Sequence, residues 1–558
     1  MISRRHMLGL GLASAALAGP AARAWAQAVD TGLDLALVNC VAWTGRPDAP
    51  ATDAVGVAGE RIAALGAEAV RALITPRTRV LDLGGAFVMP AFMDNHTHFL
   101  WGATMLSQPV LLDSTDRADF ARRVGAAAQH IRPGKWLQGG SWDEQRLGGV
   151  LPSRDWVDAV TPDTPFIAPR TDLHMYLANS VALRLAGISR DTPDPAGGVI
   201  DRDAAGEPTG ILRDNAKALI DRVVPPATDQ DADQAMRDGI AHGLKHGVAQ
   251  VHAPEISWGT HEALMRMRTR GQPDMRFYSF VPLQDWEKIA AYVAEEGRGD
   301  DWIRWGGVKG LADGSLGSRT ALFHAPYTDA PDQRGTRVMG LDELREMTLA
   351  ADAHGLHVTV HAIGDEANDD VLDVFQAAVQ ANGPRDRRFR IEHAQHVVPS
   401  AIPRFARQNV IASVQPFHAI DDGRWAVERI GEARLNGTYA FHSLMASGAR
   451  VTFGSDWPVA PLDPIIGIHA AVTRETIDGA HPHGWLPQEK VTVEQALTAY
   501  TSANAYAGFQ EDRLGVLAPG YLADIVVLDA NPLKIDPETL RELKVLRTLV
   551  GGRELHAA

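Results

Sequence analysis

The chain has 558 residues and a formal net charge of −15 at pH 7. Hydrophobic residues make up 45% of it and charged residues 22%, which is typical of a folded globular protein and excludes a disordered chain, a collagen and a coiled coil. The negative charge argues against non-specific nucleic-acid binding, which needs a basic surface. The single cysteine, Cys40, excludes an internal disulfide framework and a zinc site built from several cysteines, whereas the 21 histidines leave a histidine metal site open.

Residues 1–26 have the pattern of an export signal. Arg4 and Arg5 precede an apolar run rich in alanine, glycine and leucine, and the small-x-small triplet Ala24–Trp25–Ala26 follows it, so we expect a secretory signal peptide. The run has about 12 residues, fewer than the roughly 20 that a membrane-spanning helix needs. The paired arginines favour the twin-arginine route, with an ordinary secretory signal as the alternative. No cysteine directly follows the run, so we expect a soluble periplasmic protein without a membrane anchor.

Short apolar runs punctuated by Gly and Asp fill residues 33–88 and predict a small antiparallel β unit. Eight further apolar runs follow, each succeeded by polar residues, with amphipathic helical stretches between most of them. This alternation indicates buried parallel strands and an α/β fold, and eight of them predict a (β/α)8 TIM-type barrel over residues 89–509. The eight runs are Phe87–Asp94, Gly247–His252, Met275–Val281, Gly307–Asp313, His357–His361, Phe389–His393, Val410–Gln415 and Arg450–Asp456.

The first two of these runs are separated by about 150 residues, where a connection of roughly 30 residues is usual. Residues 105–235 are therefore predicted to form an ordered insertion after the first barrel strand. We expect this insertion to cap the mouth of the barrel and to determine which substrate is accepted. Strands after the barrel, in residues 510–558, are predicted to rejoin residues 30–88 in a small β-sandwich built from both chain ends.

Four histidines lie at predicted strand ends. His96 and His98 are two residues apart on an extended segment, so that both imidazoles point to one face, as a metal site requires; taken alone, a surface or capping role is the alternative. His361 and His393 each close a buried strand. Taken singly, each fits a hydrogen-bonded core histidine as well as a metal ligand.

Two further polar residues belong to the same end of the barrel. Lys309 lies within an apolar strand, where a buried amine is costly. Its side chain either reaches the rim of the barrel or, as a neutral amine, adds CO2 to form a carbamate that bridges two cations. Asp456 follows the eighth strand and is either a helix N-cap or a site residue. Six separate structural roles would not explain why the four histidines, Lys309 and Asp456 all lie near the carboxyl ends of predicted barrel strands.

The order His-x-His, Lys, His, His, Asp resembles the amidohydrolase superfamily, and the resemblance covers residues 30–556. The surrounding segments are similar to the amidohydrolase-3 branch, which contains YtcJ-like hydrolases and N-substituted formamide deformylases. One departure is Asp172–Leu173–His174, where Asp-Gly-His is commoner, and we expect it to narrow the pocket that this loop lines. The similar segments are Met89–His98, Gly139–Asp143, Pro193–Gly198, Lys309–Ala321 and His361–Asp365.

The resemblance implies a centre of two divalent cations. The two neighbouring histidines and Asp456 would hold one cation, the two later histidines the other, and a carboxylated Lys309 would bridge them. Zinc suits imidazole and carboxylate ligands. Asp456 would take a proton from a metal-activated hydroxide and pass it to the leaving amine. The six implied ligands are His96, His98, Lys309, His361, His393 and Asp456.

The implied function is metal-dependent hydrolysis of a non-peptide C–N bond in a small-molecule amide or N-substituted formamide. The alternatives are an esterase, lactonase or phosphoesterase with the same metal site, and a non-catalytic metal-containing binding protein. For Arg319 a loop salt bridge with Asp313 is the alternative, and for Trp142 it is core packing of the insertion. The resemblance also allows a homodimer. Candidate substrate contacts are Trp142, His174, His252, Asp313, Arg319 and Glu392.

Overall fold

The chain divides into two compact units, Met1–Phe99 with Ile240–Ala558, and Leu100–Gly239. The predicted export signal lies almost wholly outside the described residues. No helix in the described part of the chain is long and apolar enough to cross a membrane. The computed structural model describes residues 23, 26–28, 31–111, 114–170, 175–195, 198–271, 273–317 and 319–558.

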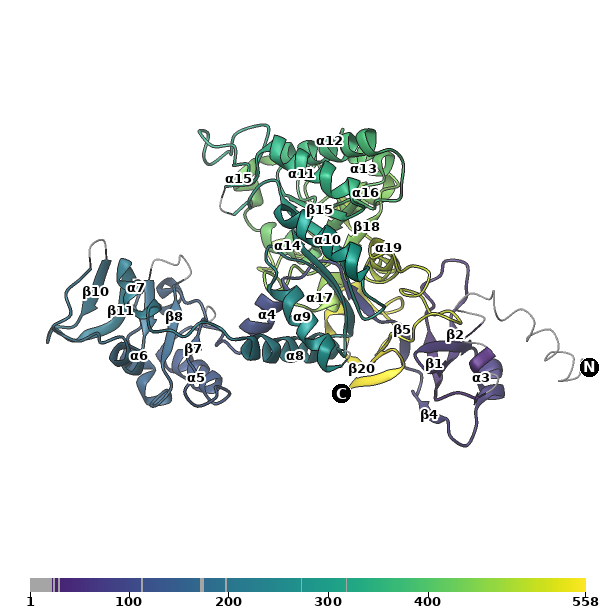
Figure 1. Ribbon diagram of the computed structural model, residues 1–558, viewed down its shortest axis with the longest axis horizontal. Coiled ribbons are helices and arrows are strands. Elements are labelled where there is room, and N and C mark those ends of the chain that lie inside the picture. The colour runs from purple at the N-terminus through teal and green to yellow at the C-terminus, as the bar shows by residue number, and fades with distance from the viewer. Residues whose placement is uncertain are drawn as a thin grey trace, which may run out of the picture. The chain divides into compact units, whose positions relative to one another are not determined.

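Eight parallel strands form the barrel of the first unit, in the order in which they occur along the chain (Figure 1). The predicted α/β barrel is thus confirmed. Five of the strands are buried along their whole length, which is why each reads as an uninterrupted apolar run. The strands are β6 (Phe92–Asp94), β12 (Val248–Pro254), β13 (Arg276–Pro282), β14 (Ile303–Leu311), β15 (His357–Ala362), β16 (Arg390–His393), β17 (Ile411–Val414) and β18 (Val451–Phe453).

Backbone hydrogen bonds bring the first and last barrel strands together just beyond their carboxyl ends. The Asp456 N–H donates to the His96 carbonyl over 2.7 Å, and the His98 N–H donates to the Trp457 carbonyl over 2.7 Å. This nearly closes the barrel. It also places the His-x-His segment beside Asp456 before any side chain is considered.

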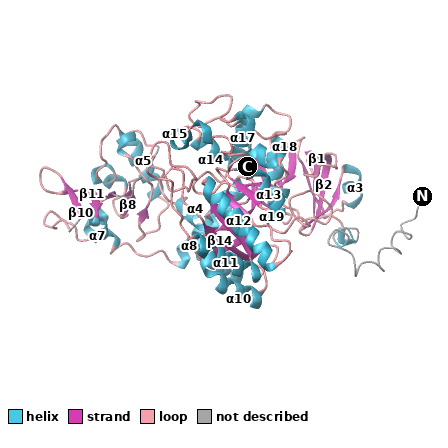
Figure 2. Cartoon of the chain, turned by 90° about the horizontal axis from the view of Figure 1, so that it is seen from above, coloured by secondary structure: helices cyan, strands magenta, loops and turns pink. Residues whose placement is uncertain are grey.

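Helices between the strands lie on the outside of the sheet (Figure 2). In α12 the buried residues Val371, Leu372, Phe375 and Ala378 recur at helical spacing and form the face that packs inward. The helices that follow successive strands are α9 (Gly259–Arg270), α10 (Trp286–Glu296), α11 (Leu341–Ala353), α12 (Asp365–Asn382), α13 (Ile402–Gln408), α14 (Pro416–Asp422), α16 (Phe441–Ala446), α17 (Pro464–Thr473), α18 (Val493–Ala499) and α19 (Ser502–Ala507).

Strands from both chain ends form one further sheet, with the order β21-β20-β19-β5-β1-β2-β3 and with β4 pairing on β1. The two ends rejoin as predicted, but β1 pairs in parallel with β4 and β5, so the N-terminal strands are not the purely antiparallel unit that was predicted. Buried side chains from both ends, such as Leu37, Val55, Ile525 and Val527, share its core. The strands are β1 (Leu35–Ala42), β2 (Thr52–Ala58), β3 (Arg61–Leu65), β4 (Arg79–Asp82), β5 (Phe87–Pro90), β19 (Ile525–Leu528), β20 (Val545–Val550) and β21 (Arg553–Ala557).

The run Phe87–Asp94, predicted as one barrel strand, is two strands in different sheets. β5 pairs with β19 and β1, whereas β6 pairs with β12 in the barrel. Pro90 has no N–H to donate and ends β5. The chain then changes partners within two residues, because the Ala91 N–H donates to the Asp524 carbonyl and the Phe92 N–H to the Gly247 carbonyl.

The second unit, Leu100–Gly239, is ordered around its own five-stranded sheet and two hydrophobic cores. Consecutive residues of β8 serve different cores, Phe166 one and Ile167 the other, as alternation along a strand requires. Its capping role stays a prediction. Its elements include α5 (Arg117–Ala128), β7 (Leu137–Gln138), β8 (Phe166–Pro169), β9 (Met175–Ala178), α6 (Ser180–Leu185), β10 (Gly198–Arg202) and β11 (Pro208–Asp214).

A buried ion pair ties the barrel to the composite sheet. Arg276, at the start of β13, donates from Nε and Nη2 to the two carboxylate oxygens of Asp524 over 2.7 and 3.0 Å. Asp524 also accepts the Gly551 N–H. Both side chains are almost completely buried.

Replacing Asp524 by alanine leaves the Arg276 guanidinium buried without its carboxylate. We expect the free energy of unfolding to fall by about 3–5 kcal/mol, seen as a lower melting temperature in calorimetry. The control is Asp274→Ala, which removes an exposed partner of Arg553 and is expected to cost about 0–1 kcal/mol. Equal losses in the two variants would contradict the structural role of this pair.

Candidate metal centre

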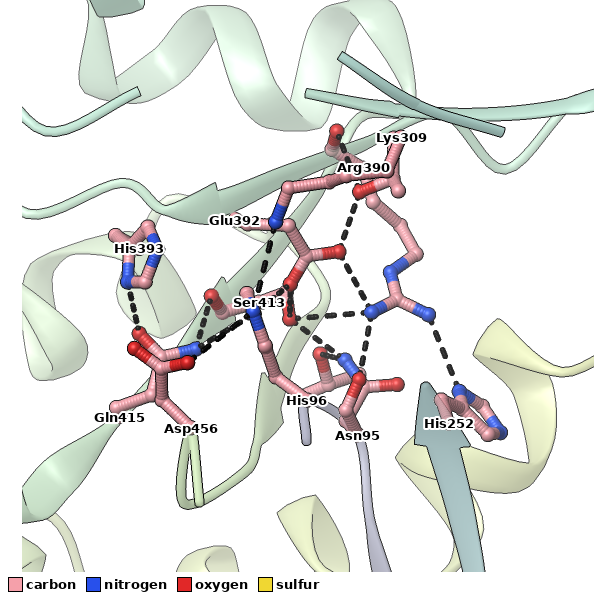
Figure 3. Close-up of polar contacts among 12 residues, drawn as sticks. Asn95, His96, His252, Lys309, Arg390, Glu392, His393, Ser413, Gln415 and Asp456 are labelled. Atoms are coloured by element: carbon pink, nitrogen blue, oxygen red, sulfur yellow. Dashed lines mark hydrogen bonds and ion pairs between the residues drawn. The ribbon is translucent and has the colours of Figure 1, made fainter. Parts of the chain in front are cut away.

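The six residues of the predicted ligand pattern meet at the carboxyl ends of five barrel strands. Figure 3 labels His96, Lys309, His393 and Asp456 among them. His96 Nε2 lies 3.4 Å from Asp456 Oδ1, and His98 Nε2 lies 3.3 Å from the same oxygen. Lys309 Nζ lies 3.5 Å from His96 Nε2. The ring of His393 is 5.1 Å from that of His96 and 4.5 Å from that of His361, centre to centre. The structure therefore brings all six into one cluster.

The geometry around Asp456 fits a cation. Its Oδ1 is buried and accepts no well-oriented hydrogen bond from any described residue, although two histidine nitrogens face it. Ligands at about 2.0–2.1 Å from a tetrahedral zinc ion are about 3.4 Å apart, which matches the distances from Oδ1 to both Nε2 atoms. Asp456 also belongs to a second group of potential ligands, with His393 and His418, whose donor atoms lie within 4.8 Å of one another. One carboxylate thus serves two groups of metal-ligating side chains.

Most of the imidazoles are held neutral, as metal ligands must be. Burial lowers the pKa of His96 to about 4, that of His361 to about 3, and that of His393 well below its usual range. His98 differs: burial lowers its pKa, but hydrogen bonds to Asp456 and Glu255 raise it to about 9. A cation at His98 therefore displaces a proton.

Lys309 is an unusual amine. Only 3% of the residue is exposed, and in the described part of the chain no carboxylate lies within ion-pair distance of Nζ. Burial lowers its pKa to about 8, against the opposing charges of Glu392 and Asp456. A fraction of Lys309 is consequently neutral near physiological pH, which is the form that reacts with CO2.

Each histidine has one ring nitrogen fixed by a partner, so that the other faces the cluster. The Nδ1–H of His96 donates to Glu392 Oε2 over 2.8 Å, and the Nδ1–H of His393 donates to Gln415 Oε1 over 2.8 Å. His361 uses the other nitrogen: its Nε2–H donates to the Gly314 carbonyl over 3.0 Å, which leaves Nδ1 for a cation.

His98 also has one ring nitrogen fixed by a partner, Glu255. Its Nδ1 lies 3.2 Å from Glu255 Oε2, just after β12, and Thr260 donates its hydroxyl to the other oxygen of Glu255 over 2.6 Å. Glu255 and Gln415 were not predicted. Both are polar residues directly after an apolar strand, the same signal that marked the histidines. His418, two residues after Pro416 in α14, also carries that signal.

Two predicted substrate contacts lie in the barrel interior instead. Glu392 is fully buried and is bound by Arg390, His96 and the hydroxyls of Thr359 and Ser413 (Figure 3). It fixes the ring of His96. His252 is also fully buried, and its Nδ1 accepts a hydrogen bond from Arg390 Nη1 over 3.1 Å.

Asp313 and Arg319 organise the loop that follows β14. Asp313 accepts three backbone N–H groups, those of Leu322, Ile363 and Gly364, over 2.8–3.0 Å, and its Oδ1 lies 3.5 Å from His361 Nε2. Arg319 forms a salt bridge, as the alternative to substrate binding predicted, but with Asp329 at 2.7 Å and not with Asp313.

The two candidates in the insertion have different outcomes. Trp142 is fully buried in a hydrophobic core of the second unit, and its Nε1–H donates to the Ala168 carbonyl over 3.0 Å. The structure thus places Trp142 in the packing role. His174, with the rest of residues 171–174, lies outside the described residues.

Comparison with known proteins gives consistent matches along the chain. A model of the amidohydrolase family matches residues 79–556. The chain is 32% identical to the putative amidohydrolase YtcJ of Bacillus subtilis, over 86% of this chain and 90% of that one. It is 29% identical to the N-substituted formamide deformylase of Arthrobacter pascens, over 93% of this chain and 97% of that one. A solved structure, an uncharacterized metal-dependent hydrolase from Pyrococcus furiosus, superposes with a TM-score of 0.72 at 31% identity, covering 90% of this chain and 100% of that one.

Replacing Glu392 by glutamine keeps the shape of the side chain but removes the charge that holds His96. We expect the affinity for zinc to fall about 10–100-fold, measured by competition with a chelator of known affinity. Glu346→Gln, on the exposed side of α11, is the matched control and should bind zinc as the unaltered protein does. If both variants retain the original affinity, Glu392 does not act on the metal centre.

Proposed function

Because the chain belongs to the amidohydrolase family, we propose that it hydrolyses a non-peptide C–N bond in a small-molecule amide or N-substituted formamide. The observation that carries the proposal is Asp456: its Oδ1 is buried without a well-oriented hydrogen bond and faces the Nε2 atoms of His96 and His98. The 29% identity to an N-substituted formamide deformylase supports the choice of bond.

The same residues suit a pair of divalent cations, which we propose to be zinc. His96 and His98 with Asp456 would hold one, and His361 with His393 the other. Lys309, carboxylated on Nζ, is proposed to bridge them, since it is buried beside His96 and has a lowered pKa. Bound cations supply a lower pKa to a coordinated water and polarise the scissile carbonyl.

Asp456 is the proposed proton carrier. Burial raises the pKa of Asp456, but its interactions with His96, His98 and His393 outweigh burial and lower the pKa below the usual range, so the carboxylate is ionised and ready to accept a proton. Its Oδ2 lies 3.9 Å from His418 Nε2, while Oδ1 faces the two neighbouring histidines. One oxygen can therefore contact a cation while the other takes the proton of the attacking water and passes it to the leaving amine.

Metal content tests the bridging role of Lys309. Protein purified without chelator should contain about two zinc equivalents per chain by mass spectrometry, because the carbamate supplies a ligand to both ions, and Lys309→Ala should contain clearly less. Lys544→Ala, at an exposed lysine, is the control. One equivalent in all three proteins would refute the bridge and leave a single-metal centre.

Replacing Asp456 by asparagine should retain metal but lower kcat by about 10²–10⁴-fold, because the amide cannot accept the proton. The assay is a panel of N-substituted formamides and amides, with matched esters and lactones, before and after chelation. Asp274→Asn, at an exposed position, should leave kcat unchanged. Turnover of esters but of no amide would refute the C–N assignment, and turnover that survives chelation would refute the metal centre.

A further inference from the structure

A cavity of about 200 Å³ opens at the amino-terminal ends of β13, β14 and β15, away from the metal-centre residues on the same strands. Arg304 is the second residue of β14, whereas Lys309 lies five residues further along. Four of the ten residues that line the cavity are arginines, and one, Asp386, is an acid. In a TIM-type barrel this end is usually structural, so a cluster of guanidinium groups around an open space calls for a physical explanation.

Two of the arginines have no carboxylate partner in the described part of the chain. Arg298 donates to the Gly355 carbonyl over 2.6 Å, and Arg304 donates to the Gly508 and Phe509 carbonyls over 2.6 and 3.1 Å. Carbonyl dipoles orient these guanidinium groups but do not cancel their charge. Burial lowers the pKa of Arg304, which indicates that its charged form is incompletely compensated.

The other two arginines share one acid. Arg385 and Arg387 both contact Asp352, the latter from Nε over 2.8 Å. Only 6% of Arg387 is exposed, and its Nη2 is buried without a hydrogen-bond partner among the described residues. An unpaired donor of this kind is rare and costs about 1–3 kcal/mol.

The acid in the lining does not neutralise the cluster. Asp386 is bound by Arg388, whose Nη2 lies 2.8 Å from its carboxylate. Arg298 and Arg385 meanwhile converge on one turn: a Cβ added to Gly355 would lie 3.3 Å from Arg385 Nη1 and 3.6 Å from Arg298 Nη2. Like charges this close repel each other, and among the described residues the one carboxylate that contacts either guanidinium is that of Asp352, on Arg385.

We propose that this cavity binds a phosphate group, either the free ion or the phosphate of a small organic molecule. Guanidinium forks match the oxygens of a tetrahedral oxyanion, and two uncompensated arginines match its double charge. At about 30 Å³ per water molecule the cavity has room for such a group with several waters. The inference does not depend on the proposed hydrolysis, since it uses none of the metal-centre residues.

Isothermal titration of the metal-loaded full chain with inorganic phosphate tests the proposal. We expect saturable binding of one phosphate per chain, at least about tenfold weaker in Arg298→Gln and in Arg304→Lys, since each loses a charge-assisted hydrogen bond. Arg304→Lys keeps the positive charge and replaces the guanidinium fork by a single ammonium, so it guards against a loss of fold. Arg553→Gln, at a half-exposed arginine outside the cavity, should bind phosphate as the unaltered chain does.

A parallel titration with glycerol 3-phosphate distinguishes the two sources of the group: tighter binding than inorganic phosphate assigns the cavity to a phosphate ester, and weaker binding assigns it to the free ion. A third titration, after removal of metal, should still show binding. Absence of binding for both ligands would overturn the proposal. So would phosphate binding that is lost on removal of metal but unchanged in Arg298→Gln and Arg304→Lys, because the anion would then lie at the metal centre.

Discussion

The interior of this barrel depends on one buried carboxylate, that of Glu392. A charge in such a place is stable only if it is fully paired, and Glu392 is paired by Arg390 and His96 and by the hydroxyls of Thr359 and Ser413. These partners come from β15, β16, β17 and the segment after β6, so one charge fixes four strands in relation to each other. The same interactions give His96 its tautomer. Stability of the barrel and readiness of the metal centre therefore rest on the same atoms, and neither can be changed alone at this position.

The two ends of the barrel have opposite chemistry. At the carboxyl end, Glu255 and Asp456 stand among imidazoles, an arrangement that favours cations. At the amino end, Arg298 and Arg304 bind only backbone carbonyls among the described residues, an arrangement that favours anions. One strand can contribute to both ends: β14 has Arg304 near its start, at the arginine cavity, and Lys309 near its end, at the metal centre. Separation of the charges along a strand avoids direct competition, since neither set of groups lies within hydrogen-bond distance of the other.

The sequence predicted the barrel and the ligand cluster because both depend on local patterns. Buried parallel strands read as apolar runs, and polar residues after them fall at one end of the barrel. It did not predict the split of Phe87–Asp94, because the two halves differ only in which distant strands accept their hydrogen bonds. Glu392 was predicted to contact substrate, but it lies in the network below His96. His393, the next residue, leaves the extended conformation with a φ of 74°, and its side chain lies at the cluster. The salt-bridge partner of Arg319, Asp329, was not predicted either, because it depends on the conformation of a loop and loops have no periodic sequence pattern.

The division of the chain into two units separates the residues of the candidate metal centre from the insertion. Every residue of the metal cluster identified in the described chain belongs to the unit that contains the barrel, and the partners that orient the histidines belong to it as well. The insertion has two hydrophobic cores and a sheet of its own, so its fold is maintained by contacts that do not involve the metal centre. If the insertion caps the barrel as predicted, substitutions in its loops would alter what is bound while His96, Lys309 and Asp456 keep their geometry. Family membership therefore specifies the reaction centre more closely than the molecule on which it acts.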